Sequence, residues 1–382
     1  MKRLSLFDMN IGLTLSLLFV GFPFLGISLI NSQYTLPNEP IKDALYLHNT
    51  SISNLTLRDC SFRPSNNPNV CPDQDIRFIL YTPGGKRQIF DYQQHDWLRQ
   101  SDWDPDKENI LLFHGYAGGD ETLPMVVLKD AYIRNGSYNV WFVDWGVLCQ
   151  PPCYRAAVHN TKAVAMCTGH LLTQLRKDGL DTDRVTCVGH SLGAHICGQI
   201  SKFVVFRMHR IVGLDPARPL ITNNIKLNSG SAGAVHVLHT NAGHYGEGGR
   251  SGHVDFCING GKVQPFCENV GFDDQLCSHV WAVCYMAESI FPNLAKKAEP
   301  CSRRCPSGPR PGHRIGIPIF MGQQTPLSAS GSYCIRDKSP PYCPTEVGGF
   351  GDPRCCLKAP DYKPPSTTPM NDVDTIKNKI IY

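Results

Sequence analysis

Short apolar runs alternate with longer stretches of helical periodicity over most of this chain. Strands are predicted over residues 76–81, 109–113, 139–144, 184–189, 210–214 and 234–239. Helices are predicted over residues 156–175, 192–206 and 277–290. Because strand–helix alternation produces parallel strands with helices on both faces, we expect an α/β fold with a mostly parallel central sheet in a single domain.

The composition excludes several other classes of chain. Of the 382 residues, 42% are hydrophobic, which allows a large core and excludes a disordered or collagen-like chain. The 37 Lys and Arg residues nearly balance the 33 Asp and Glu residues, and no basic stripe stands out. Nucleic acid is therefore not expected as a partner.

The N-terminal segment and the cysteines indicate export. A basic pair precedes an apolar run over residues 11–30, which predicts a secretory signal peptide over residues 1–32, with an uncleaved membrane anchor as the alternative. Most of the 17 cysteines fall in loops bounded by Gly and Pro, as is typical of disulfides in an oxidising compartment. Possible glycan acceptors at Asn49, Asn54 and Asn135 agree with a secreted glycoprotein.

The rest of the chain divides into three parts. Residues 33–70 are polar and Asn-rich, which predicts a loosely held lead-in segment. The strand–helix pattern and a following region rich in Cys, Pro and Gly predict one domain over residues 71–345. Residues 346–382 have recurring prolines and no apolar face, which predicts a flexible tail.

The sharpest motif is the G-x-S-x-G sequence Gly189-His190-Ser191-Leu192-Gly193, between a predicted strand and a predicted helix. A serine at such a turn has a strained backbone that exposes its hydroxyl, and the glycines let the strand and the helix approach closely. A tight turn with an incidental serine is the alternative. The strand–turn–helix context favours Ser191 as a nucleophile.

A nucleophilic serine needs a histidine as base and a carboxylate that orients the histidine. Asp215 ends a predicted strand and precedes a proline, so we expect its carboxylate at the carboxyl edge of the sheet; a turn-forming aspartate is the alternative. The residues alone do not choose the base. The candidates by position are His236, His239, His244, His253 and His279.

Two backbone amides are candidates for stabilising the negative oxygen that forms during acyl transfer. Gly115 follows a predicted buried strand and allows the chain to turn, so that the N–H of Tyr116 can point at this oxygen. The N–H of Leu192, at the start of the predicted helix, is the second expected donor. Together they predict an oxyanion hole beside Ser191.

Six motifs in order along residues 71–343 resemble the pancreatic lipase superfamily. They are LFHGY at 112–116, VDW at 143–145, VGHSLGAH at 188–195, GLDPA at 213–217, VDF at 254–256 with NGG at 259–261, and CSH at 277–279. The resemblance implies an α/β-hydrolase fold, with Ser191 as nucleophile, Asp215 as acid and His279 as base. It also implies Tyr116 and Leu192 as the oxyanion donors.

The chain departs from the triacylglycerol lipases of that superfamily in its lid. Their long helical lid lies between two bridged cysteines, whereas the matching Cys267 and Cys277 enclose only residues 268–276. A helix of this length spans about 13 Å, too little to cover a wide lipid groove. The short lid is similar to that of secreted arthropod phospholipases A1. We expect neither the C-terminal β-sandwich of pancreatic lipases nor a colipase-like partner.

The resemblance also bears on metal binding. Where members of the superfamily bind a structural calcium, this chain has Arg218, Asn228 and Ser231, which do not supply the anionic oxygens that calcium needs. No metal and no cofactor are therefore expected. Trp281 replaces an arginine common in the superfamily, which predicts either altered helix packing or an aromatic side chain near lipid.

Disulfide pairing is implied by the resemblance at two places, Cys71 with Cys149 and Cys267 with Cys277. Cys187 lies in the predicted strand before Ser191 and Cys197 in the helix after it. We expect these two as free buried thiols.

The sequence therefore predicts a secreted carboxylic-ester hydrolase that acts as a monomer on lipid at a membrane, micelle or droplet surface. The short lid favours a phospholipase A1, which releases the sn-1 fatty acid of phospholipids. The first alternative is a triacylglycerol lipase of the same superfamily. The second is a non-catalytic lipid-carrier or yolk-like relative, but such relatives lose the serine that this chain retains as Ser191.

Overall fold

The computed structural model describes residues 59–64, 70–83, 86–94, 96–268, 274–301, 305, 316–339, 342 and 356. The predicted signal peptide over residues 1–32 lies outside them, as do most of the lead-in segment and most of the tail. None of the helices in this part of the chain is long and apolar enough to span a bilayer.

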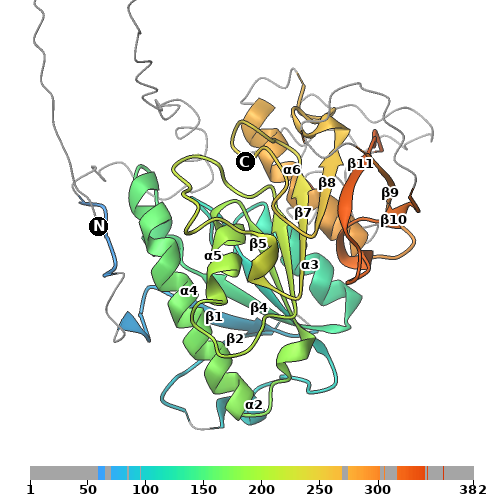
Figure 1. Cartoon of the computed structure of the whole chain (residues 1–382). Helices are drawn as coiled ribbons and strands as arrows, with labels where there is room; N and C mark the ends of the chain where they lie inside the picture. Colours follow the sequence, from blue (N-terminus) through green and yellow to red (C-terminus); the bar gives the residue numbers. More distant parts are fainter. Residues whose placement is uncertain are drawn as a thin grey trace, which may run out of the picture. The chain divides into compact units, whose positions relative to one another are not determined.

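One sheet of eleven strands organises the described residues, in the order β10-β9-β11-β8-β7-β6-β5-β3-β4-β1-β2 (Figure 1). The strands are β1 (Arg77–Tyr81), β2 (Arg87–Ile89), β3 (Glu108–Phe113), β4 (Tyr138–Asp144), β5 (Val185–His190), β6 (Arg210–Leu214), β7 (Ala234–His239), β8 (Val254–Ile258), β9 (Lys297–Pro300), β10 (Ile319–Phe320) and β11 (Gly331–Ile335). The strands from β11 to β4 in this order are parallel, and the outer strands pair antiparallel. The predicted mostly parallel sheet is confirmed.

Helices cover both faces of this sheet. α4 (Tyr154–Lys177) and α5 (Leu192–Ile200) pack on one face, and α3 (Met125–Asn135) and α6 (Asp274–Ser289) pack on the other (Figure 1). Each face has its own hydrophobic core, so central strands such as β5 are buried at every position. The short helical elements are α2 (Trp97–Gln100), η3 (Gly146–Cys149), η4 (Thr182–Arg184), η5 (Ser229–Ser231), η6 (Asn259–Gly261) and η7 (Gly322–Gln324).

The six strands expected from the sequence form within one residue of their predicted ends. The helix predicted over residues 192–206 is wrong in its second half, because α5 ends at Ile200 and the hydroxyl of Ser201 donates to the carbonyl of Gly198 at 2.9 Å. Phe203 then packs against α4, so closely that a Cβ on Gly169 would lie 2.8 Å from the Cβ of Phe203. Tertiary packing thus overrides the local helical pattern. Helix α3 and strand β8 were not among the predicted elements.

Two disulfides reach beyond the domain predicted over residues 71–345. Cys60, in the predicted lead-in segment, forms a disulfide with Cys153. Cys356, in the predicted tail, is buried and forms a disulfide with Cys284 of α6. Disulfides therefore tie parts of the lead-in segment and of the tail to the domain, which the polar composition of these segments did not indicate.

Two of the expected cysteine assignments are also wrong. Cys71 pairs with Cys167 of α4, and Cys149 is a buried free thiol. Cys187 and Cys197 form a disulfide, because α5 packs back over β5 after the turn and brings the two side chains together. The Cys267–Cys277 disulfide is confirmed. The remaining disulfides join Cys257 to Cys305 and Cys301 to Cys334.

Candidate active site

Ser191 occupies the turn between β5 and α5 at the carboxyl edge of the sheet. Its backbone has φ 56° and ψ -119°, a left-handed conformation that costs free energy in a non-glycine residue. Backbone hydrogen bonds tie this turn to the end of β6 and the residues after it. The Ser191 N–H donates to the Leu214 carbonyl at 3.0 Å, and the Ala217 N–H donates to the Ser191 carbonyl at 3.2 Å. A Cβ on Gly189 would lie 2.3 Å from the carbonyl oxygen of Gly193, so this strand–helix approach requires glycine.

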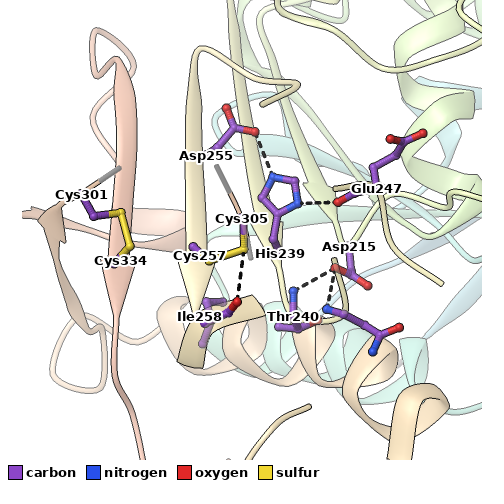
Figure 2. Close-up of a disulfide and its surroundings, with 12 residues drawn as sticks. Asp215, His239, Thr240, Glu247, Asp255, Cys257, Ile258, Cys301, Cys305 and Cys334 are labelled. Carbon is purple, nitrogen blue, oxygen red and sulfur yellow. Dashed lines mark hydrogen bonds and ion pairs between the residues drawn. A yellow bond between two sulfur atoms is a disulfide. The ribbon is translucent and has the colours of Figure 1, made fainter. Parts of the chain in front are cut away.

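Asp215 and His279 are in direct contact. The Nδ1 of His279 lies 2.6 Å from the Oδ2 of Asp215, and both side chains are buried. The other carboxylate oxygen, Oδ1, accepts the backbone N–H groups of Thr240 at 2.8 Å and Asn241 at 3.0 Å (Figure 2). With the proton of Nδ1 directed at the carboxylate, the Nε2 of His279 is left with the lone pair that a general base needs.

His190 links the histidine to the serine turn. Its Nε2 donates to the backbone carbonyl of His279 at 3.1 Å, and the two imidazole rings lie 4.7 Å apart between centroids. Burial lowers the pKa of His190 well below its usual range, with the proximity of His279 as a second cause, so this donor is neutral. Since Ser191 follows His190 directly, the bond holds the His279 backbone beside the serine turn.

Residues 114–116, which we call the oxyanion segment, lie against Ser191. A Cβ on Gly115 would be 2.8 Å from the Cβ of Ser191, so the two backbones are in close approach. Within the described residues, neither the N–H of Tyr116 nor that of Leu192 donates a hydrogen bond to another protein group. Both amides are therefore available to a ligand oxygen.

His114 holds the start of this segment in place. Its ring is stacked on Trp145 at 5.3 Å and on Phe142 at 5.9 Å between centroids. The ring Nδ1 donates to the carbonyl of Gly115 at 2.8 Å, and Nε2 accepts the backbone N–H of Trp145 at 3.0 Å. The LFHGY and VDW motifs are thus joined in space by one histidine.

A family model described as Lipase matches residues 53–304. The chain belongs to the lipase family. Its fold, with a mostly parallel sheet, helices on both faces and a serine at the turn between β5 and α5, is that of an α/β-hydrolase.

Curated relatives in the lipase family match about 60% of the chain or less. The chain is 30% identical over 237 residues to phospholipase A1 member A of Rattus norvegicus, covering 59% of this chain and 51% of that protein. It is 29% identical over 259 residues to pancreatic lipase-related protein 2 of Sus scrofa, covering 60% and 54%, respectively. It is 31% identical over 202 residues to lipase member H of Rattus norvegicus, covering 51% and 45%. The chain spans about half the length of the curated relatives it matches.

The Cys267–Cys277 disulfide, which the resemblance predicts to bound the lid segment, reaches α6 through Cys277, two residues before His279. Next to it, the hydroxyl of Ser278 accepts the N–H of Gln264 at 2.8 Å and donates to the carbonyl of Asp274 at 2.7 Å. These bonds fix the helix turn that carries His279. Residues 269–273, on which the predicted short lid depends, lie outside the described part of the chain.

Trp281 is buried in the core between α6 and the sheet, and its ring is stacked on Phe266 at 6.1 Å between centroids. Of the two expectations for this position, altered helix packing stays a prediction. An aromatic side chain at a lipid surface is excluded here because Trp281 is only 1% exposed.

Two of the positions where the resemblance places a structural calcium have other interactions in this chain. The Arg218 guanidinium donates from Nη1 to the carbonyl of Gly243 at 2.6 Å and places a positive charge there. The side chain of Asn228 accepts the Gly230 N–H at 2.9 Å and so caps η5. Among the residues the structure describes, no group of three or more His, Cys, Asp and Glu side chains is arranged to hold a metal ion.

The other candidate histidines are placed elsewhere. His236 is buried on the α6 face of β7, and neither of its ring nitrogens has a hydrogen-bond partner among the described residues. His253 accepts the N–H of Val235 at the opposite edge of the sheet, and His239 pairs with Asp255. Sequence reasoning missed the amides of Thr240 and Asn241 on Asp215, because a backbone donor carries no residue signal.

Proposed function

We propose that the chain is a serine ester hydrolase that acts on lipids, with Ser191 as nucleophile, His279 as base and Asp215 as the orienting acid. The observation that carries this proposal is the 2.6 Å contact between the His279 Nδ1 and the Asp215 Oδ2. The bond from His190 to the His279 carbonyl links this contact to the turn of Ser191, whose backbone has the strain typical of a nucleophile. The unpartnered amides of Tyr116 and Leu192 support an oxyanion hole at the same place.

In the first half of the reaction the Ser191 hydroxyl oxygen attacks the ester carbonyl carbon while the Nε2 of His279 takes its proton. The imidazolium that forms is stabilised by the carboxylate of Asp215. The tetrahedral oxyanion accepts hydrogen bonds from Tyr116 and Leu192, each worth about 10²–10³-fold in rate in related sites. Collapse expels the alcohol, which receives the proton from His279, and leaves an acyl-serine.

In the second half, water attacks the acyl-serine carbonyl carbon and gives a proton to the same Nε2. The fatty acid leaves, and the proton returns to the oxygen of Ser191. Two ordered half-reactions at one histidine need no cofactor.

For the substrate, we propose a phospholipid cleaved at the sn-1 ester by a secreted, monomeric enzyme at a membrane or micelle surface. Two observations support it: only residues 268–276 lie between Cys267 and Cys277, and phospholipase A1 member A is among the similar proteins. A triacylglycerol lipase is the second candidate, since pancreatic lipase-related protein 2 is also similar.

The test is fatty-acid release from phosphatidylcholine vesicles with different acyl chains at sn-1 and sn-2, compared with a triolein emulsion. We expect release of the sn-1 acid, faster than from triolein, and none with Ser191→Ala. Faster release from triolein would favour the triacylglycerol lipase. Full activity of Ser191→Ala, with unchanged thermal unfolding, would contradict the proposed nucleophile.

A further inference from the structure

A second histidine–carboxylate pair lies behind Asp215, away from the serine. His239, the last residue of β7, is fully buried, and both of its ring nitrogens face oxygen atoms (Figure 2). Its Nε2 lies 3.0 Å from the Oδ1 of Asp255, and its Nδ1 lies 3.1 Å from the backbone carbonyl oxygen of Glu247. Because both partners accept, the two nitrogens donate at the same time only when the ring is an imidazolium.

Charge on this ring is consistent with its surroundings. Burial opposes it, but the hydrogen bond and the negative charge of Asp255, followed by the charge of Asp215, raise the pKa of His239 above its usual range. The other charged groups nearby are paired, Lys226 with the carboxylate of Glu247 at 2.6 Å and Arg250 with Asp255 at 3.6 Å. Two buried carboxylates, those of Asp255 and Asp215, therefore favour the charged form of the His239 ring.

Asp255 is itself fixed. Its Oδ1 accepts the N–H of Ser251 at 2.8 Å, and its Oδ2 accepts the N–H of Gly252 at 3.2 Å. Because backbone amides hold the carboxylate of Asp255, it does not move with the ring of His239. Asp255 thus anchors the ring of His239 to the loop before β8.

The segment over residues 240–247 joins this pair to Asp215 (Figure 2). Its first two residues, Thr240 and Asn241, donate their N–H groups to the Oδ1 of Asp215. Near its other end, a Cβ on Gly246 would lie 2.3 Å from the Oδ2 of Asp215, so this backbone closes over the carboxylate. His239 contacts both ends of the segment, through the peptide bond to Thr240 and through the Glu247 carbonyl.

We propose that His239 and Asp255 form a positioning pair, which clamps the segment over residues 240–247 around Asp215 and so keeps the Oδ2 of Asp215 directed at the Nδ1 of His279. The pair touches no reacting atom. It acts through the backbone donors that orient the carboxylate. The effect on catalysis rests on the proposed function, whereas the effect on the Asp215–His279 bond does not.

The first test compares His239→Gln and Asp255→Asn with a control, His236→Gln. His236 lies on the same strand and is equally buried, but it faces the opposite core and has no side-chain hydrogen bond within the part of the chain that the structure describes. On a soluble short-chain p-nitrophenyl ester, we expect kcat of the first two variants to fall about 10–100-fold with KM within about twofold, because a small misplacement of a catalytic group has effects of this size. We expect kcat of His236→Gln to stay within about threefold of the parent value.

The second test needs no activity. A proton in a short histidine–carboxylate bond gives a far-downfield proton NMR resonance, which is assigned to His279 by its loss in Asp215→Asn. We expect this resonance to shift or broaden in His239→Gln and Asp255→Asn, and to be unchanged in His236→Gln. If His239→Gln does not fold, Asp255→Asn decides, since an amide oxygen in the place of Oδ1 can still accept the Ser251 and Gly252 N–H groups.

The outcomes separate the two proposals. An inactive parent protein with the expected changes in the resonance would overturn the proposed function and support the positioning pair. An active parent protein, with kcat and the resonance unchanged in Asp255→Asn, would overturn the positioning pair alone.

Discussion

The Nδ1 of His279 lies 2.6 Å from the Oδ2 of Asp215, although 64 residues separate them along the chain. Asp215 follows β6 at the carboxyl edge of the parallel strands, and His279 is in the second turn of α6. The Cys267–Cys277 disulfide and the hydroxyl of Ser278 fix that part of α6. One contact therefore joins the sheet, a helix and a disulfide loop at a single place.

Removing the charge of Asp215 tests this contact. In Asp215→Asn the side chain no longer stabilises an imidazolium or selects the Nδ1–H tautomer of His279, so we expect kcat for a short-chain ester to fall about 10³–10⁴-fold. The matched control is Asp183→Asn, the same change at an exposed position in η4. Retention of more than a tenth of the parent rate in Asp215→Asn would show that Asp215 is not the orienting acid.

Space beside Ser191 limits what residue 115 can be. In Gly115→Ala the added methyl group would meet the Ser191 Cβ at 2.8 Å and the His190 carbonyl oxygen at 3.3 Å, so either the serine turn or the oxyanion segment must shift. We expect kcat to fall at least about 10²-fold. In the control, Gly119→Ala in the same loop, the nearest atom to the methyl group is at 3.7 Å, and we expect near-parental kcat. Equal kcat in the two variants would contradict the close approach.

The thiol of Cys149 lies under the oxyanion segment, with its sulfur 3.6 Å from the carbonyl oxygen of Gly115. Burial, and then the charge of Asp144, raise the pKa of Cys149 far above its usual range, so the nucleophilic thiolate does not form near neutral pH. At pH 8 we expect iodoacetamide to leave the Cys149 peptide unmodified in the folded protein and to modify it after denaturation without reductant, as read by mass spectrometry. Rapid modification of the folded protein would disprove the burial.

Glu288, near the end of α6, makes stability depend on pH. Burial raises the pKa of Glu288 to about 7, although Lys296, at 3.2 Å, opposes the shift. The folded protein therefore keeps a proton that the unfolded chain releases, and the free energy of unfolding falls as pH rises from about 4.5 to about 7.

The variant Glu288→Gln removes this titration. From pH 5 to pH 8 we expect the parent protein to lose about 1–3 kcal/mol of unfolding free energy relative to this variant, measured by urea denaturation. The two proteins should be most similar at pH 5, where the parent side chain is protonated. If the free energies of unfolding of the two proteins changed in parallel over this pH range, the raised pKa of Glu288 would be contradicted.

The fold was predictable because its strands are buried on both faces. A continuous apolar run such as the one in β3 has few alternatives in an α/β chain, and the G-x-S-x-G motif between β5 and α5 places the serine turn. The position of Asp215 at the carboxyl edge of the sheet was predictable from the residues alone. Its role as the orienting acid was not, because a turn-forming aspartate after a strand has the same local sequence.

Five histidines fitted the base by position. The resemblance to the pancreatic lipase superfamily implied His279, but the residues alone do not distinguish the five, whereas their three-dimensional neighbours do. His279 meets the carboxylate of Asp215, whereas His239, nearer in sequence to Asp215, meets Asp255 and the Glu247 carbonyl. Disulfide partners show the same limit: nothing local to Cys71 indicates Cys167 rather than Cys149. Periodicity and turn chemistry act between near neighbours in the chain and so establish strands, helices and the strained serine. The choice among distant side chains depends on how the helices and loops pack over the sheet, which is a property of the whole folded chain.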